Sequence, residues 1–136
     1  YVHTQFSVEQ IKAVRAKYED VQVVVHPECK PEVVAAADTN GSTAFIIRLV
    51  EEAPDGARIA VGTEANLVHR LDNAHPTKSV IPLTESHCVT MGRNNVYNLL
   101  RALESILAGQ PVEQVQVSPE VKQYAKVAVE RMLQES

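Results

Sequence analysis

The sequence predicts an α/β fold built on a short, mostly parallel sheet and followed by a C-terminal helix. Short runs of β-branched residues recur along the chain, the clearest at residues 21–25. Each run is followed by a loop of polar residues, and each loop by a segment whose apolar residues have helical spacing. Strands that alternate with amphipathic helices are typical of parallel sheets joined by crossover helices.

The size and composition indicate one globular domain. The chain has 136 residues, of which 45% are hydrophobic and 22% charged, so it can bury a core and is not of the disordered class. Its net charge of -4 gives no basic field, and we expect no nucleic-acid or membrane partner. No apolar run approaches the roughly 18 residues of a membrane span, and no signal peptide is recognisable. These features favour a cytoplasmic protein.

The N-terminal third contains two helix starts and one strand. Ser7 and Gln10 form a capping box, which predicts a helix to about residue 18. Residues 21–25 are typical of a buried strand, which must end before Pro27. Pro31 suits the first turn of a short helix over residues 31–37.

The middle of the chain predicts a turn, a helix, a strand and a second helix. Residues 38–41 are a cluster of turn formers. Residues 42–53 have the length of a helix and are apolar on most sides, so we expect this helix to be largely buried. A second strand is expected at residues 58–61, and residues 62–64 then begin a helix to about Leu71.

The C-terminal part predicts one more strand and two helices. The strand covers residues 79–83, and the loop over residues 84–94 contains Cys88. Apolar residues at helical spacing predict a helix from about residue 96, which Gly109 ends. Residues 112–118 are a candidate linker before the final helix.

Polar side chains follow three of the expected strands, where open parallel sheets bind their ligands. These loops begin with His26-Pro27-Glu28-Cys29, Thr63-Glu64 and Ser86-His87-Cys88. A histidine and a carboxylate two residues apart suit general acid/base catalysis. The alternative is that these loop side chains are simply solvated.

Gly41-Ser42-Thr43 places two hydroxyls and free backbone N–H groups at the start of a helix. Such a terminus binds anions, but an ordinary serine or threonine N-cap explains the pattern equally well.

The two cysteines, Cys29 and Cys88, are better treated as separate thiols than as a disulfide. His26 and Cys29 have the spacing of half a zinc site, but a second ligand pair is missing. Cys88 is compatible with buried packing, a nucleophile or one ligand of a shared metal centre, and spacing alone favours packing.

Six short strings occur in order along the chain, and together they are specific. They are V-H-x-x-F at residues 2–6, V-H-P-E-C at 25–29, A-D-x-x-G-S-T at 37–43, G-T-E at 62–64, C-x-x-M-x-x-N at 88–94 and R-M-L at 131–133. In this combination the chain resembles the C-terminal part of the quinolinate synthase A family, the bacterial enzymes that make quinolinate for NAD biosynthesis.

The resemblance implies three similar three-layer αβα domains around a central [4Fe-4S] cluster, which is held by one cysteine from each domain. Cys88 matches the third cluster ligand, whereas Cys29 matches a position that is not a ligand. Residues 1–20 would then end the preceding domain or connect to it, residues 21–110 would form the αβα domain, and residues 111–136 would be a C-terminal linker and helix. The two missing ligands would lie in N-terminal domains upstream of this chain, so we expect the isolated chain to be inactive.

The resemblance also implies the reaction, in which iminoaspartate condenses with dihydroxyacetone phosphate. His26, Pro27 and Glu28 match the segment that contacts iminoaspartate, with Glu28 as the candidate acid/base, and Ser42 and Thr43 match substrate-binding hydroxyls. Two other classes remain open: a non-catalytic anion-binding α/β module that uses Ser42 and Thr43, and a small zinc-binding interaction domain. The zinc ligands would be His26, Cys29, His87 and Cys88.

Overall fold

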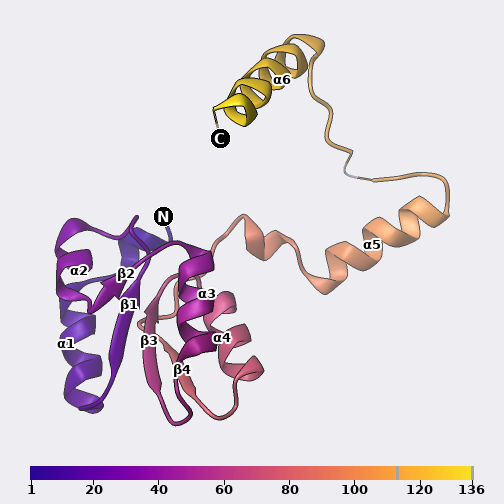
Figure 1. Cartoon of the computed structure of the whole chain (residues 1–136). Coiled ribbons are helices and arrows are strands. Elements are labelled where there is room, and N and C mark those ends of the chain that lie inside the picture. Colours follow the sequence, from indigo (N-terminus) through magenta and orange to yellow (C-terminus); the bar gives the residue numbers. More distant parts are fainter. Residues whose placement is uncertain (113, 136) are drawn as a thin grey trace. The chain divides into compact units, whose positions relative to one another are not determined.

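The computed structural model describes residues 1–112 and 114–135, and these fall into two compact units, Tyr1–Gly92 and Arg93–Ser136. The first unit has the predicted α/β fold (Figure 1). Its elements in chain order are the 3-10 turn η1 (His3–Gln5), α1 (Val8–Lys17), β1 (Gln22–Val25), α2 (Pro31–Ala36), β2 (Thr39–Asn40), α3 (Thr43–Glu52), β3 (Arg58–Gly62), α4 (Ala65–Ala74) and β4 (Ser79–Pro82).

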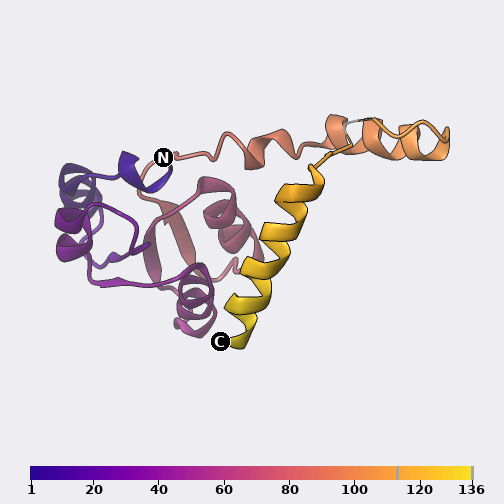
Figure 2. The same cartoon turned by 90° about the horizontal axis from the view of Figure 1, so that it is seen from above.

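The four strands form one parallel sheet in the order β2-β1-β3-β4. Helices α1 and α2 cover one face and α3 and α4 the other, which makes the three-layer arrangement that we expected (Figures 1 and 2). All four strands therefore direct their carboxyl ends to the same edge of the sheet.

The strand register explains why the run of valines is buried on both sides. Successive side chains of a strand point to opposite faces. Val23 pairs with Ala60 and both pack under α1 and α2, whereas Val24 pairs with Val61 and both pack under α3 and α4. Because both faces are covered, the strands are continuously apolar instead of alternating.

Two expectations for the middle of the chain are wrong in part. The turn-forming residues 38–41 contain the short strand β2, which pairs with β1 because Gly41 N–H donates to the Val25 carbonyl. Helix α3 is not buried on most sides, because only Ile46 and Val50 are fully buried and its opposite face is exposed. Burial of one face of α3 is enough for packing, because the helix contacts only one side of the sheet.

Charged side chains complete backbone hydrogen bonding around the sheet. Asp38 accepts the N–H of Val23 at 2.6 Å, and its other oxygen accepts from Arg15 at 2.6 Å. The Lys78 ammonium donates to the carbonyls of Val50 and Glu51, both at 2.7 Å, and so satisfies the C-terminus of α3. These contacts give Asp38 a structural role.

The second unit contains α5 (Val96–Leu107) and α6 (Pro119–Gln134), and the 3-10 turn η2 (Met91–Arg93) spans the boundary between the two units in the sequence. The apolar stripe predicted for α5 is present, and no residue of it is buried. Part of the candidate linker, residue 113, lies outside the described residues. Among the described helices, none combines the length and apolar character needed to cross a membrane.

Candidate functional site

The strand order gathers the predicted loops at the carboxyl edge of the sheet. Strand β1 lies between β2 and β3, so the loop that carries His26 and Glu28 has the loop of residues 41–43 on one side and that of residues 63–64 on the other. The N–H of His26 donates to the Gly62 carbonyl at 3.1 Å, which holds this loop against the end of β3. The edge therefore brings the sequence-predicted loops together.

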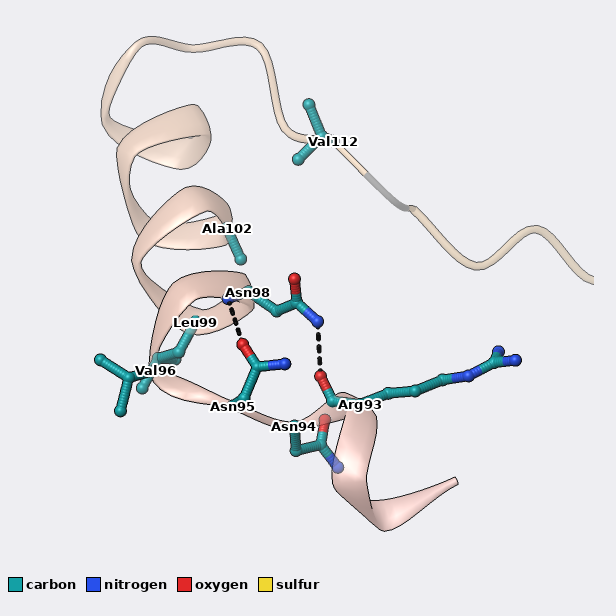
Figure 3. Close-up of a pocket in the computed structure, with 8 residues that line it drawn as sticks. All are labelled: Arg93, Asn94, Asn95, Val96, Asn98, Leu99, Ala102 and Val112. Carbon is teal, nitrogen blue, oxygen red and sulfur yellow. Dashed lines mark hydrogen bonds between the residues drawn. The ribbon is translucent and has the colours of Figure 1, made fainter. Parts of the chain in front are cut away.

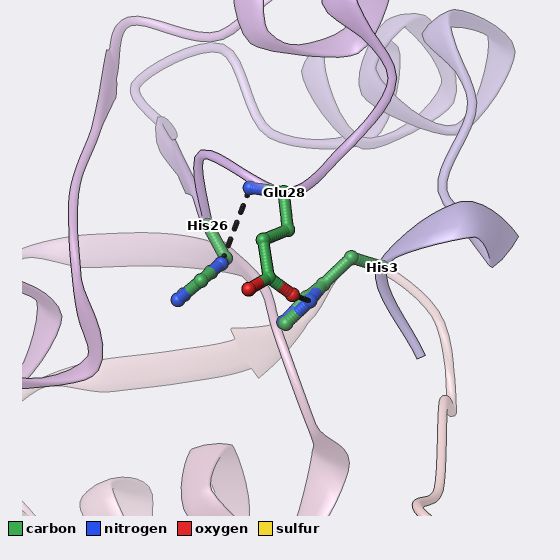
Figure 4. Close-up of side chains that lie close together, drawn as sticks. All are labelled: His3, His26 and Glu28. Carbon is green, nitrogen blue, oxygen red and sulfur yellow. Dashed lines mark hydrogen bonds and ion pairs between the residues drawn. The ribbon is translucent and has the colours of Figure 1, made fainter. Parts of the chain in front are cut away.

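The N-terminal residue His3 meets this loop and completes a three-residue cluster (Figure 4). Its ring is stacked on that of His26, with centroids 4.2 Å apart and planes 7° apart. Its Nδ1 lies 3.0 Å from the Glu28 carboxylate, and its Nε2 lies 3.3 Å from the Thr63 hydroxyl. His3 thus links the loop after β1 with the loop after β3.

The protonation of His26 follows from one backbone contact. The N–H of Glu28 donates to His26 Nδ1 at 3.2 Å, so Nδ1 carries a lone pair and the ring proton is on Nε2. Burial lowers the pKa of His26, and the neighbouring His3 lowers it further, whereas Glu28 raises it. At neutral pH His26 therefore presents a neutral ring with an Nε2–H donor.

Glu28, His3 and Thr63 form a carboxylate–imidazole–hydroxyl chain. The carboxylate can only accept, so His3 Nδ1 donates to it, and in a neutral ring Nε2 then accepts from the Thr63 hydroxyl. Thr63 is 3% exposed, while the Glu28 side chain is 74% exposed. This series of hydrogen bonds therefore runs from the buried Thr63 hydroxyl to the exposed Glu28 carboxylate, which a ligand can reach, and such an arrangement suits proton transfer.

The Gly41-Ser42-Thr43 motif has two distinct parts. Ser42 is the N-cap of α3, since its hydroxyl accepts the Phe45 N–H at 3.3 Å. Thr43 is the first residue of the helix and is exposed. The capping function predicted as an alternative thus belongs to Ser42, and the Thr43 hydroxyl is not the cap.

The two cysteines have opposite environments. Cys29 is 5% exposed, its Sγ lies 3.7 Å from the Gly62 carbonyl, and burial raises its pKa to about 11. Cys88 is partly exposed, which contradicts the buried packing that spacing alone favoured. Hydrogen bonds from the Thr90 hydroxyl and the Met91 N–H lower the pKa of Cys88. Cys88 therefore fits a thiolate metal ligand, and Cys29 does not.

The four ligands of the zinc alternative do not form a site, because the Cys29 thiol is buried against the strand end. Among the described residues, the cluster that brings metal-ligating atoms within 4.8 Å of one another is His3, His26 and Glu28. Ring lone pairs lie in the ring plane, and the two stacked planes are nearly parallel. One ion cannot bind both histidines unless a ring turns.

A groove in the second unit contains none of the predicted site residues (Figure 3). It runs along the first turns of α5, and two of its three asparagines are used in local structure. Asn95 caps the helix by accepting the Asn98 N–H at 2.9 Å, and the Asn98 amide donates to the Arg93 carbonyl at 2.6 Å. Arg93 is its one charged group, so the groove offers no acid/base pair.

Sequence reasoning located His26 and Glu28 and placed Thr63 in a loop at the same edge, but it gave Thr63 no individual role and gave His3 none at all. Both belong to strings that carry the family resemblance, V-H-x-x-F and G-T-E, so the sequence contains a signal for them. Their contacts join residues 25 and 60 positions apart, which spacing alone does not reveal.

Comparisons with known proteins indicate one family along nearly the whole chain. The family model described as quinolinate synthetase A protein matches residues 1–134. The chain is 46% identical over 134 residues to a quinolinate synthase of Nocardioides sp. and 48% identical over 137 residues to one of Acidobacterium capsulatum. It is 45% identical over 134 residues to one of Lysinibacillus sphaericus.

These matches cover 97 to 98% of this chain and 34 to 37% of the relatives. The chain thus spans about a third of the length of the curated relatives that it matches. The match extends through both units and includes the clustered residues His3, His26 and Glu28. By this match the chain belongs to the quinolinate synthetase A protein family.

Proposed function

We propose that this chain is part of a quinolinate synthase of NAD biosynthesis. The reaction condenses iminoaspartate with dihydroxyacetone phosphate, releases phosphate and water, and closes the pyridine ring of quinolinate. Family membership supports this proposal, and so does the cluster of His3, His26 and Glu28 at the carboxyl edge of the sheet. The cluster is the observation that carries it, because dehydration and ring closure both require proton transfers.

The family implies a [4Fe-4S] cluster, and Cys88 would hold one of its irons. A partly exposed thiol with a lowered pKa has the chemistry of such a ligand. When bound, the cluster supplies a Lewis-acidic iron without a protein ligand. The chain offers no second suitable thiol, so the other two ligands would come from the N-terminal domains of the same enzyme.

His26 and Glu28 would act on iminoaspartate from the loop after β1. His26 is a fixed donor because its Nδ1 is occupied by the Glu28 N–H, so its Nε2–H binds a substrate carboxylate or carbonyl oxygen. Glu28 moves protons, and His3 holds its carboxylate in place through Nδ1–H. Pro27 keeps the two side chains on a short, restricted loop.

Thr43 would bind an anionic oxygen of the substrate. Its hydroxyl lies at the positive end of the α3 dipole, which favours negative charge. Ser42 supports this by capping the helix, so that the first turn keeps its geometry. Because both substrates are anions, this terminus suits the proposed chemistry.

The 136-residue chain alone would be inactive, because two cluster ligands and the N-terminal domains are outside it. The full-length enzyme is therefore the object to test. Cys88→Ala should abolish the iron and sulfide content and the visible absorption after anaerobic reconstitution. Cys29→Ala, the matched control, should retain both.

Melting temperatures of both variants show whether they fold. A folded Cys88→Ala enzyme with undiminished iron and sulfide would overturn the proposal, as would their loss in a folded Cys29→Ala enzyme. Purified full-length protein without quinolinate formation from the two substrates would also contradict it.

A further inference from the structure

Glu64 is a buried carboxylate that acid/base chemistry at the site does not use. Its side chain is 10% exposed, although acidic groups are seldom buried without a reason. It receives three donors: Oε2 accepts the Leu67 N–H at 3.3 Å, and Oε1 accepts from the Asn66 amide at 2.8 Å and the Cys88 N–H at 3.4 Å. The contact with Leu67 caps the N-terminus of α4, whereas the contact with Cys88 joins two residues that are 24 positions apart in the sequence.

Two hydrogen bonds, one donated from each side, join the start of α4 to the loop that leads to Cys88. The Ala65 N–H donates to the Ser86 carbonyl at 2.8 Å, and the Cys88 N–H donates back to the Glu64 side chain. Ser86 is fully buried, and its hydroxyl donates to the Val2 carbonyl at 2.9 Å. The loop is therefore fixed between α4 and the N-terminal segment just before the thiol.

We infer that Glu64 is a positioning residue for Cys88: its carboxylate holds the Cys88 N–H and so sets the direction of the thiol toward the metal centre. This inference rests on the proposed function for the identity of that centre. The bond is long, but its acceptor is a carboxylate whose side chain is largely buried, and a buried acceptor makes a stronger hydrogen bond than one in water. His87 adds a second contact, with Nδ1 at 3.9 Å from Glu64 Oε1.

Glu64→Asp separates this role from helix capping. Aspartate is a preferred N-cap residue, so α4 keeps its first hydrogen bond. The side chain is one methylene shorter, and it cannot reach the Cys88 N–H from the same position. The matched control is Glu85→Asp, which makes the same change in the loop that leads to Cys88, at a carboxylate that contacts His69 and His87 instead.

Amide hydrogen exchange measured by NMR on the 136-residue chain tests the contact without any metal. In Glu64→Asp the Cys88 amide should exchange at least ~10-fold faster, while the amides of α4 stay protected. In Glu85→Asp the Cys88 amide should be unchanged. Should Glu64→Asp fail to fold, Glu64→Ser serves, because serine also caps a helix N-terminus and its side chain is too short to reach the Cys88 N–H.

In the full-length enzyme, Glu64→Asp should also lower the iron bound per chain after reconstitution, and Glu85→Asp should not. Unchanged exchange at Cys88 in a folded Glu64 variant overturns the inference, whatever the iron content. Iron that is retained in Cys88→Ala instead contradicts the proposed function, so the two failures are distinguishable.

Discussion

The imidazole rings of His3 and His26 are stacked in parallel, 4.2 Å apart between centroids. His3 comes from the 3-10 turn η1, and His26 follows β1, so folding of the N-terminal segment onto the sheet creates the pair. The stack shields one face of His26 from water and places a second basic ring beside it. Both effects disfavour the charged form of His26.

His3→Gln should therefore raise the pKa of His26 toward its ordinary value of 6.5. Burial is the larger cause of the depression and His3 the second, and loss of the stacked ring relieves both. NMR titration of the His26 ring protons measures the change directly. His69→Gln, at an exposed histidine that contacts Glu85, is the control and should leave the pKa of His26 unchanged.

The same depression predicts a pH dependence of folding stability. His26 has a lower pKa in the folded chain than in the unfolded chain, so below about pH 6.5 the unfolded state binds more protons. Stability from this group is complete above pH 6.5 and is lost as the pH falls toward the folded pKa. In urea unfolding, His26→Gln should show a shallower loss of stability over this window, and an equally steep loss would contradict the assignment.

Much of the fold follows from local sequence, because its signals are local. The capping box at Ser7 and Gln10 is formed as predicted, and the three longer strands begin within one residue of their expected positions. Strand β2 could not be predicted in this way. Its residues, Thr39 and Asn40, lie in a turn-forming cluster, and only pairing with β1 makes them a strand.

The candidate site was predictable only in part. His26 and Glu28 are recognisable because they follow a strand directly. His3 and Thr63 join them through tertiary contacts, and the role of each depends on which ring nitrogen of His3 carries a proton. Glu64 is similar, since its sequence position indicates a helix cap and its reach to Cys88 is visible only in three dimensions.

Glu28→Gln in the full-length enzyme should lower the rate of quinolinate formation by ~10² to 10⁴. The substitution keeps the shape of the side chain and removes the titratable group. The visible spectrum of the proposed iron–sulfur cluster should stay normal, since the proposal gives Glu28 no role as a ligand. Glu32→Gln, an exposed carboxylate in the first turn of α2, is the control and should retain the rate. A near-normal rate in Glu28→Gln would limit Glu28 to binding.

Two adjacent alanine variants separate capping from binding at the start of α3. Ser42→Ala removes the cap and should lower the free energy of unfolding by ~1 kcal/mol. Thr43→Ala should leave stability nearly unchanged and weaken a dicarboxylate substrate analogue roughly 10- to 150-fold, because a hydroxyl bound to a charged oxygen contributes ~1.5 to 3 kcal/mol. Thermal unfolding and calorimetric titration of the full-length enzyme measure the two effects. Unchanged affinity in Thr43→Ala would remove its substrate role.

The two thiols should react at very different rates with iodoacetamide in the folded 136-residue chain. The thiolate is the form that reacts with iodoacetamide. Because burial raises the pKa of Cys29 to about 11, only ~1 in 1,000 of the Cys29 thiols is ionised at pH 8. The Cys29 sulfur is also covered by the protein. Cys88 is partly exposed and its pKa is lowered, first by the Thr90 hydroxyl.

Peptide mass spectrometry after brief alkylation should therefore find the label on Cys88 and almost none on Cys29. In urea both thiols should be labelled at similar rates, because unfolding removes the burial of Cys29. Thr90→Val removes the hydroxyl while keeping the shape of the side chain, so it should slow the labelling of Cys88 without affecting Cys29. Equal labelling of both thiols in the folded chain would show that Cys29 is accessible, and it would remove the physical reason for choosing Cys88 as the metal ligand.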